Sequence, residues 1–216
     1  MTERGMIFNA EMVRAILDGR KTQTRRPIKW KQTRFTEIGE REDGSKWPWS
    51  EDAEHACDFW HPCPFGAVGD RIWVRETWNK YGGLLTYRAD HDWIDDMRKE
   101  TVCTAKWVPS IHMPRWASRI LLEITDVRVE RLNAISPEDA ESEGLECTNF
   151  TGFGDEPGLP SYPEPDVYFD PLKKQWKEYP PEAFAGLWES IYGEGSWQAN
   201  PWVWVIEFKR VEGGAA

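Results

Sequence analysis

Apolar residues recur at helical spacing in two parts of the chain. Residues 10–18 carry an apolar stripe made of Met12, Val13, Ile16 and Leu17. This spacing predicts a short amphipathic helix, with Asn9 as its N-cap and Gly19 where the helix ends. Residues 183–192 repeat the pattern with Phe184, Leu187, Trp188 and Ile191, which predicts another helix of the same kind.

A third helix is predicted by a start signal rather than by periodicity. Ser136-Pro-Glu-Asp139 combines a cap, a proline in the first turn and an acid at the third position;. The helix should be short and end at Gly144, which places Glu143 in its last turn. A carboxylate there opposes the helix dipole, and breaches of local rules are enriched at functional sites.

Strand-like patterns are spread along the chain. Residues 71–78, 119–132 and 202–209 are the main candidates, and Tyr87 fits a further short strand. The alternation in 119–132 changes phase near Thr125-Asp126, which predicts a bulge or bend. Short helices among scattered strands favour an α+β fold with a mainly antiparallel sheet or barrel.

Two segments lack a clear pattern. Residues 30–66 read as irregular, with Pro48, Pro62 and Pro64, and residues 146–182 read as a long surface loop rich in Pro, Gly and acids;. We therefore expect a single domain over 1–216 with insertions at 30–66 and 146–182.

Composition narrows the class of protein. The 14 Trp residues mean that large rings supply much of the core;. No apolar run reaches the 18 residues of a membrane span, and the first six residues lack the apolar core of a signal peptide, so we expect a cytoplasmic protein with reduced cysteines. The net charge of −10 argues against bulk non-specific DNA binding, although residues 20–34 hold seven Lys or Arg and no acid;.

The most informative segment is Gly19-Arg20-Lys21-Thr22-Gln23-Thr24-Arg25-Arg26. It resembles the signature of the ASCH superfamily, in which a glycine, a lysine and a later basic residue fall here on Gly19, Lys21 and Arg26. Segments 68–78, 111–119, 135–144 and 200–204 are similar to the longer members associated with bacteriophages and prophages.

This resemblance implies a PUA-like β-barrel with flanking helices, acting on RNA or nucleotides. The motif is similar to that of small bacterial amidohydrolases that remove the acetyl group from N(4)-acetylcytidine without a metal or cofactor. In those enzymes a Lys, a Thr three residues later and a Glu carry the chemistry, and these fall on Lys21, Thr24 and Glu143. Two alternatives remain open, a non-catalytic module that binds RNA or a modified nucleobase, and a ribonuclease.

The same three residues can be judged by their chemistry. Amide hydrolysis requires a nucleophile, a base and an acid for the leaving amine. Thr24 is the candidate nucleophile, Lys21 its base if desolvation and nearby cations lower its pKa, and Glu143 the acid or the anchor of the substrate amine. Lys21 and Thr24 point to opposite faces of a straight strand, so the chain must bend at about 21–23. The plain alternative is a solvated lysine beside an ordinary strand threonine.

Four further residues are candidate substrate contacts. Arg26 and Arg115 suit a phosphate or carboxylate, Trp116 can stack on a base, and Glu76 stands at a strand end beside Arg75;. A separate group of His55, Cys57, His61 and Cys63 offers four possible zinc ligands in nine residues. Its spacing is not that of paired CxxC knuckles, so the sequence favours incidental Cys and His over a metal site.

Overall fold

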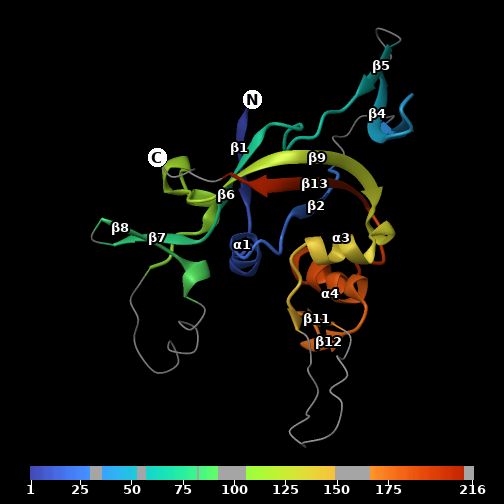
Figure 1. The fold of residues 1–216 in the computed structure, drawn as a ribbon. Coiled ribbons are helices and arrows are strands. Elements are labelled where there is room, and N and C mark those ends of the chain that lie inside the picture. The colour runs from blue at the N-terminus through green and yellow to red at the C-terminus, as the bar shows by residue number, and fades with distance from the viewer. Residues whose placement is uncertain (30–35, 53–56, 82, 92–105, 149–165, 212–216) are drawn as a thin grey trace, which may run out of the picture.

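The computed structural model describes residues 1–29, 36–52, 57–81, 83–91, 106–148 and 166–211 (Figure 1). The described fold is mixed α+β, with many strands and few helices. Its main sheet has the strand order β1-β6-β9-β13-β2, and β1 and β2 are its edges among the described strands. β1 and β6 pair in parallel and every other neighbouring pair is antiparallel. The bounds are β1 Glu3–Ile7, β2 Gln23–Pro27, β6 Arg71–Arg75, β9 Leu121–Arg131 and β13 Trp202–Arg210.

Three small antiparallel sheets lie around the main sheet (Figure 1). They are formed by β3 Thr36–Glu40, β4 Lys46–Asp52 and β5 Cys57–Trp60; by β7 Trp78–Tyr81 and β8 Leu84–Tyr87; and by β10 Cys147–Thr148, β11 Val167–Asp170 and β12 Gln175–Lys177.

The helices are short. They are α1 Ala10–Leu17, α3 Pro137–Ser142 and α4 Pro180–Tyr192, with single turns at η1 Arg88–Asp90, η2 Ser110–His112, η3 Arg115–Ala117 and η4 Leu132–Ala134. Among the described residues, no helix has the length and apolar character needed to cross a bilayer.

Several predicted elements are confirmed, with their local causes. The Asn9 side chain accepts a hydrogen bond from the backbone N–H of Met12 at 2.8 Å, so it caps α1;. Ser136 caps α3 in the same way, through the N–H of Asp139 at 3.1 Å. The predicted bulge is present, because the pairing of β13 with β9 steps from Asp126 to Ile124 and leaves out Thr125;.

Other predictions were wrong in their boundaries. The described residues of segment 30–66 include a regular sheet of β3, β4 and β5, and Pro48 lies inside β4, paired with Ile38. The predicted strand 71–78 is too long, because β6 ends at Arg75 and Trp78 is the first residue of β7. The predicted loop 146–182 contains β10, β11 and β12, although residues 149–165 lie outside the described part. Helix α4 begins at Pro180, because proline fits the first helical turn;.

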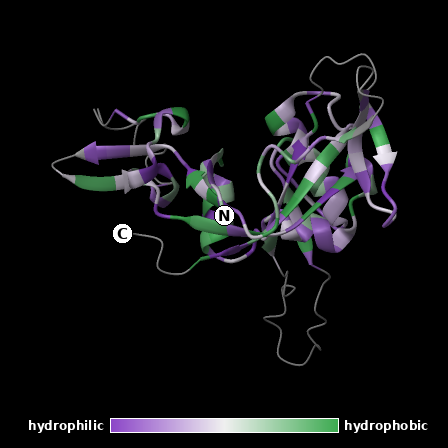
Figure 2. Ribbon diagram, turned by 90° about the horizontal axis from the view of Figure 1, so that it is seen from above, coloured by the Kyte–Doolittle hydropathy of each residue, from purple (hydrophilic) through white to green (hydrophobic). Residues whose placement is uncertain are grey.

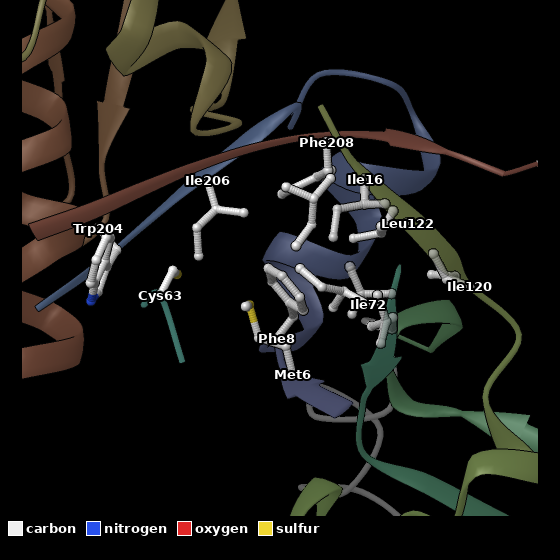
Figure 3. Close-up of a cluster of buried hydrophobic side chains, with 14 of the residues drawn as sticks. Met6, Phe8, Ile16, Cys63, Ile72, Ile120, Leu122, Trp204, Ile206 and Phe208 are labelled. Carbon is white, nitrogen blue, oxygen red and sulfur yellow. The ribbon is translucent and has the colours of Figure 1, made fainter. Parts of the chain in front are cut away.

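Both faces of the main sheet are buried. Alternating residues of β13 point to opposite faces of the sheet and pack into two hydrophobic cores. The first core contains Trp204, Ile206 and Phe208, and the second contains Val203 and Val205. Figure 3 shows the first core, where Phe8, Ile72 and Leu122 pack below β13. Figure 2 shows hydrophobic and hydrophilic residues interleaved along the ribbons of the strands. The second core packs α4 against the sheet, which brings the end of α4 toward β2.

Candidate functional site

Lys21 lies at a bend between helix α1 and strand β2. Helix α1 ends at Leu17, and Gly19 takes a φ of 78°, a left-handed conformation that turns the chain;. The backbone N–H of Lys21 then donates to Ala15 O at 2.9 Å, and β2 begins two residues later at Gln23. The bend expected from side-chain parity is therefore present, and it turns the Lys21 side chain inward.

The Lys21 ammonium meets the carboxylate predicted to join it. Nζ lies 2.7 Å from Oε2 of Glu143 and 2.8 Å from the backbone oxygen of the same residue. The two side chains are 0% and 3% exposed. The C-terminal turn of α3 presents Glu143 because Gly144 takes a φ of 86° and lies against Lys21, where an added Cβ would be 2.7 Å from the lysine Cβ. A side chain at 144 would crowd Lys21 out of this position.

Arg25 holds the other oxygen of the Glu143 carboxylate. Its Nη1 lies 3.3 Å from Glu143 Oε1, while its Nη2 lies 2.7 Å from Asp139 Oδ2 and 3.1 Å from Glu130 Oε2. The Arg25 side chain is fully buried. Arg128 extends this network to Asp139 at 3.1 Å. The Glu143 carboxylate is thus oriented from two sides by cations, and its network reaches the surface through Arg128.

Burial dominates the electrostatics of Lys21. Removal of its ammonium from water lowers the pKa of Lys21 from the ordinary 10.5, the ion pair with Glu143 opposes this, and the cations Arg26 and Arg25 lower the pKa further;. The net direction is downward. A lysine with a lowered pKa loses its proton more readily, which is what a lysine base requires.

Thr24 lies in strand β2, three residues after Lys21, and lines a small cavity. It pairs with Ile206 of β13 and is 1% exposed. The cavity has a volume of about 20 Å³, and Thr24, Glu143, Trp188 and Tyr192 contribute to its wall. Within the described part of the chain, the Thr24 side chain has no hydrogen-bond partner. A cavity of this size holds about one water molecule.

A large groove adjoins this small cavity. It has a volume of about 940 Å³ and an apolar wall that includes Ile28, Pro48, Phe59, Pro64, Phe65 and Trp204. Arg26 and Tyr192 line both the groove and the small cavity, so they form the partition between the two. A ligand in the groove would reach Thr24 past these two side chains.

Tyr192 was missed by the sequence analysis. It is the last residue of α4 and was expected only to end a helix. Burial raises the pKa of its hydroxyl, while the charge of Arg26 and a hydrogen bond with that guanidinium oppose the rise. The only sequence signal was the amphipathic stripe of α4, which does not say where the helix end points.

The other predicted substrate contacts have separate surroundings. Arg26 donates from Nη2 to Ile7 O at 2.8 Å and lies at the partition described above. Glu76 is 1% exposed and forms an ion pair with Arg119 at 2.9 Å, and burial raises the pKa of its carboxyl. Arg115 pairs with Glu3 at 2.9 Å.

Trp116 is 60% exposed and stands edge-on to Trp78, with Lys80 over its ring. The partners of Glu76, Arg115 and Trp116 lie just before β9, in β1 and in β7, and not at the Lys21–Glu143 pair.

The possible zinc ligands are only partly described. His55 lies outside the described residues, as does the side chain of Cys57. His61 Nε2 lies 2.9 Å from Ser50 Oγ, and burial raises the pKa of the Cys63 thiol to about 11. Over the ranges that can be assessed, no three His, Cys, Asp or Glu side chains gather as a metal site would require.

Comparisons with protein-family models, with curated proteins and with solved structures found no match for this chain. Function is therefore inferred from the Lys21–Glu143 pair and from the small cavity that Glu143 shares with Thr24.

Proposed function

We propose that this chain is an ASCH-type protein with a PUA-like fold and that it deacylates a modified nucleoside or base of the N(4)-acetylcytidine kind. The observation that carries the proposal is the buried Lys21–Glu143 pair, with Nζ 2.7 Å from Oε2, at a cavity that Thr24 shares. Glu143, 122 positions from Lys21 in the sequence, contacts the Lys21 amine and lines the same small cavity as Thr24. The motif resemblance supplies the substrate class.

The reaction follows from these three groups. The neutral Lys21 amine takes the proton of the Thr24 hydroxyl as the threonine oxygen bonds to the acyl carbon. The bond between the acyl carbon and the exocyclic amine then breaks, and the leaving amine takes the proton of the Lys21 ammonium, directly or relayed through Glu143, so that Lys21 is neutral again. Water next attacks the acyl carbon of the acyl-threonine ester while the neutral Lys21 amine takes its proton; the free acid leaves, and Lys21 returns the proton to the threonine oxygen. The Arg26 guanidinium at the cavity wall stabilises the oxyanion.

Arg25 is a positioning residue in this proposal. It binds Glu143 Oε1 and leaves Oε2 to Lys21, so the carboxylate keeps one orientation. Its positive charge also lowers the pKa of Lys21. Loss of Arg25 should therefore change the pH dependence of the reaction as well as its rate.

The experiment is a panel of acylated nucleosides assayed for acid release. We expect wild-type protein to release acetate from N(4)-acetylcytidine and the Lys21→Ala variant to lose that activity by about a thousandfold or more. The Lys80→Ala variant removes a lysine whose ammonium lies over the Trp116 ring and serves as the control. Equal turnover by wild type and Lys21→Ala would refute the assignment of Lys21.

One observation favours a second candidate, a non-catalytic module that binds RNA or a modified nucleobase. Thr24 is 1% exposed, and its cavity of about 20 Å³ is too small for an acyl group unless Tyr192 or Arg26 moves. If the partition stays closed, the large groove can bind a ligand but no reaction follows. Binding of acetylcytidine without acetate release, in an assay in which a working deacetylase gives a signal, would favour this candidate.

A further inference from the structure

We propose that the large groove is a binding site for a nucleoside monophosphate, with the base on the apolar wall, its acyl end toward Arg26, and the phosphate on Lys29 and Arg75. The inference deepens the proposed function and rests on it for the choice of a nucleotide. It assigns the phosphate, which the Lys21, Thr24 and Glu143 cluster does not explain, to side chains outside that cluster.

The charges in the groove carry the argument. Arg26, Lys29 and Arg75 line it, and none of the described lining residues is Asp or Glu. Arg75 donates to the backbone oxygens of Ser110 and Ile111, and Arg26 to that of Ile7. Across the described ranges, none of these three cations pairs with a carboxylate. Three cations that have no carboxylate partner among the described residues, in a chain of net charge −10, favour an anionic ligand;.

Arg26 also has donor capacity to spare. Its Nε is buried and has no hydrogen-bond partner among the described atoms. A buried donor without a partner is costly, so a small rotation of the guanidinium that brings Nε to a ligand oxygen would relieve that cost;. Because Arg26 also lines the small cavity beside Thr24, a ligand held by Arg26 lies next to the proposed reaction centre.

The remaining walls fit a planar ring. Phe59 is 51% exposed and packs edge-on against His61, with ring centroids 4.8 Å apart. Pro48, Pro62 and Pro64 add flat apolar surface. A volume of about 940 Å³ lies at the upper end of the range for small-ligand sites and accommodates one nucleotide;.

A second cavity near Glu143 fits an anion less well. Its volume is about 450 Å³, and Glu11, Glu143 and Glu146 line it together with only two arginines, Arg14 and Arg20. A phosphate there would meet three carboxylates. The two larger cavities thus differ in charge, and the anion should bind in the large groove.

The test compares binding of cytidine 5′-monophosphate and of cytidine by calorimetry, because both lack the acyl group and neither needs turnover. We expect the monophosphate to bind at least about tenfold more tightly, with a preference that shrinks as salt rises. Lys29→Gln and Arg75→Gln should each reduce that preference. Arg41→Gln should not, since Arg41 stacks on Trp47 and does not line the groove.

The outcomes separate this inference from the proposed function. Tight monophosphate binding without acetate release from any acylated nucleoside or nucleotide would overturn the deacylase and leave the groove assignment standing. Acetate release with equal affinity for cytidine and its monophosphate would keep the deacylase and overturn the groove assignment. Lys29 is exposed, so Lys29→Gln keeps the test valid even if Arg75→Gln disturbs folding. A preference that Lys29→Gln leaves unchanged, in a folded protein, would also overturn it.

Discussion

Removing Glu143 and removing Lys21 from their buried pair should lower the free energy of unfolding by different amounts. Glu143→Leu leaves the fully buried Lys21 ammonium without its carboxylate, and breaking a buried ion pair on one side costs about 3–5 kcal/mol;. Lys21→Met leaves Glu143 with a second cation, Arg25 at 3.3 Å, so it should cost about 1–3 kcal/mol;. The carboxylate is therefore the more damaging partner to remove.

The double variant should recover much of this loss. With both side chains apolar, Arg25 keeps Asp139 and Glu130, and no charge is left unpaired at the bend. We expect a coupling free energy of about 2 kcal/mol or more between the two sites. In a chain of this length, Glu143→Leu alone should lower the melting temperature by about 6–20 °C.

Urea and thermal unfolding at pH 7 measure these differences. The exposed pair of Asp18 and Arg20, at 3.0 Å, is the control, and its coupling should stay below about 1 kcal/mol;. Equal losses for Glu143→Leu and Lys21→Met, with a double variant that simply adds them, would show that the two groups do not depend on each other.

Three further predictions follow from the same structure. The folded chain holds the pKa of Lys21 below its ordinary value of 10.5, so the unfolded chain binds more protons between the two pKa values;. The free energy of unfolding of wild type should therefore rise with pH up to about 10.5;. Denaturation of Lys21→Met at a series of pH values should lack this rise. Gly144→Ala and Gly19→Ala both force alanine into a left-handed conformation, which costs about 1–2 kcal/mol;. Only the Cβ added at residue 144 also lies 2.7 Å from the Lys21 Cβ, so Gly144→Ala should unfold at a lower urea concentration and lose more activity. Equal effects of the two substitutions would contradict the close contact. Asp70 accepts hydrogen bonds from the backbone N–H groups of Thr2 and Ala67, which lower its pKa to about 2. The stability that its carboxylate contributes should therefore be lost as pH falls from about 4 through 2;. The acid unfolding of Asp70→Asn should lack this loss of stability between about pH 4 and 2;.

Much of the local structure could be predicted, because it depends on near neighbours. Three or four consecutive residues were enough to predict each of three features: the cap of α1 by Asn9, the cap of α3 by Ser136 and the bulge at Thr125. The bend at Lys21 was required by side-chain parity once Lys21 and Thr24 were assumed to act together.

What could not be predicted depends on contacts between distant segments. Pro48 signals a break in a sequence, yet aromatic cross-strand pairs such as Trp49 opposite Trp60 keep β4 in a sheet;. Arg25 looked like one more cation in a basic strip, and only its contacts with Asp139 and Glu130 show that it is fully buried. Tyr192 reaches the site because α4 packs on the second core, which no local pattern encodes.

The most direct test of the central claim is the rate of acetate release at saturating N(4)-acetylcytidine by three threonine variants. Thr24→Val keeps the shape of a side chain that has no hydrogen-bond partner in the described structure, so folding should be unaffected while the rate falls by about a thousandfold or more. Thr24→Ser should retain measurable turnover, and Thr22→Val, two residues away and exposed, should match wild type. A folded Thr24→Val protein that releases acetate at the wild-type rate would contradict the claim.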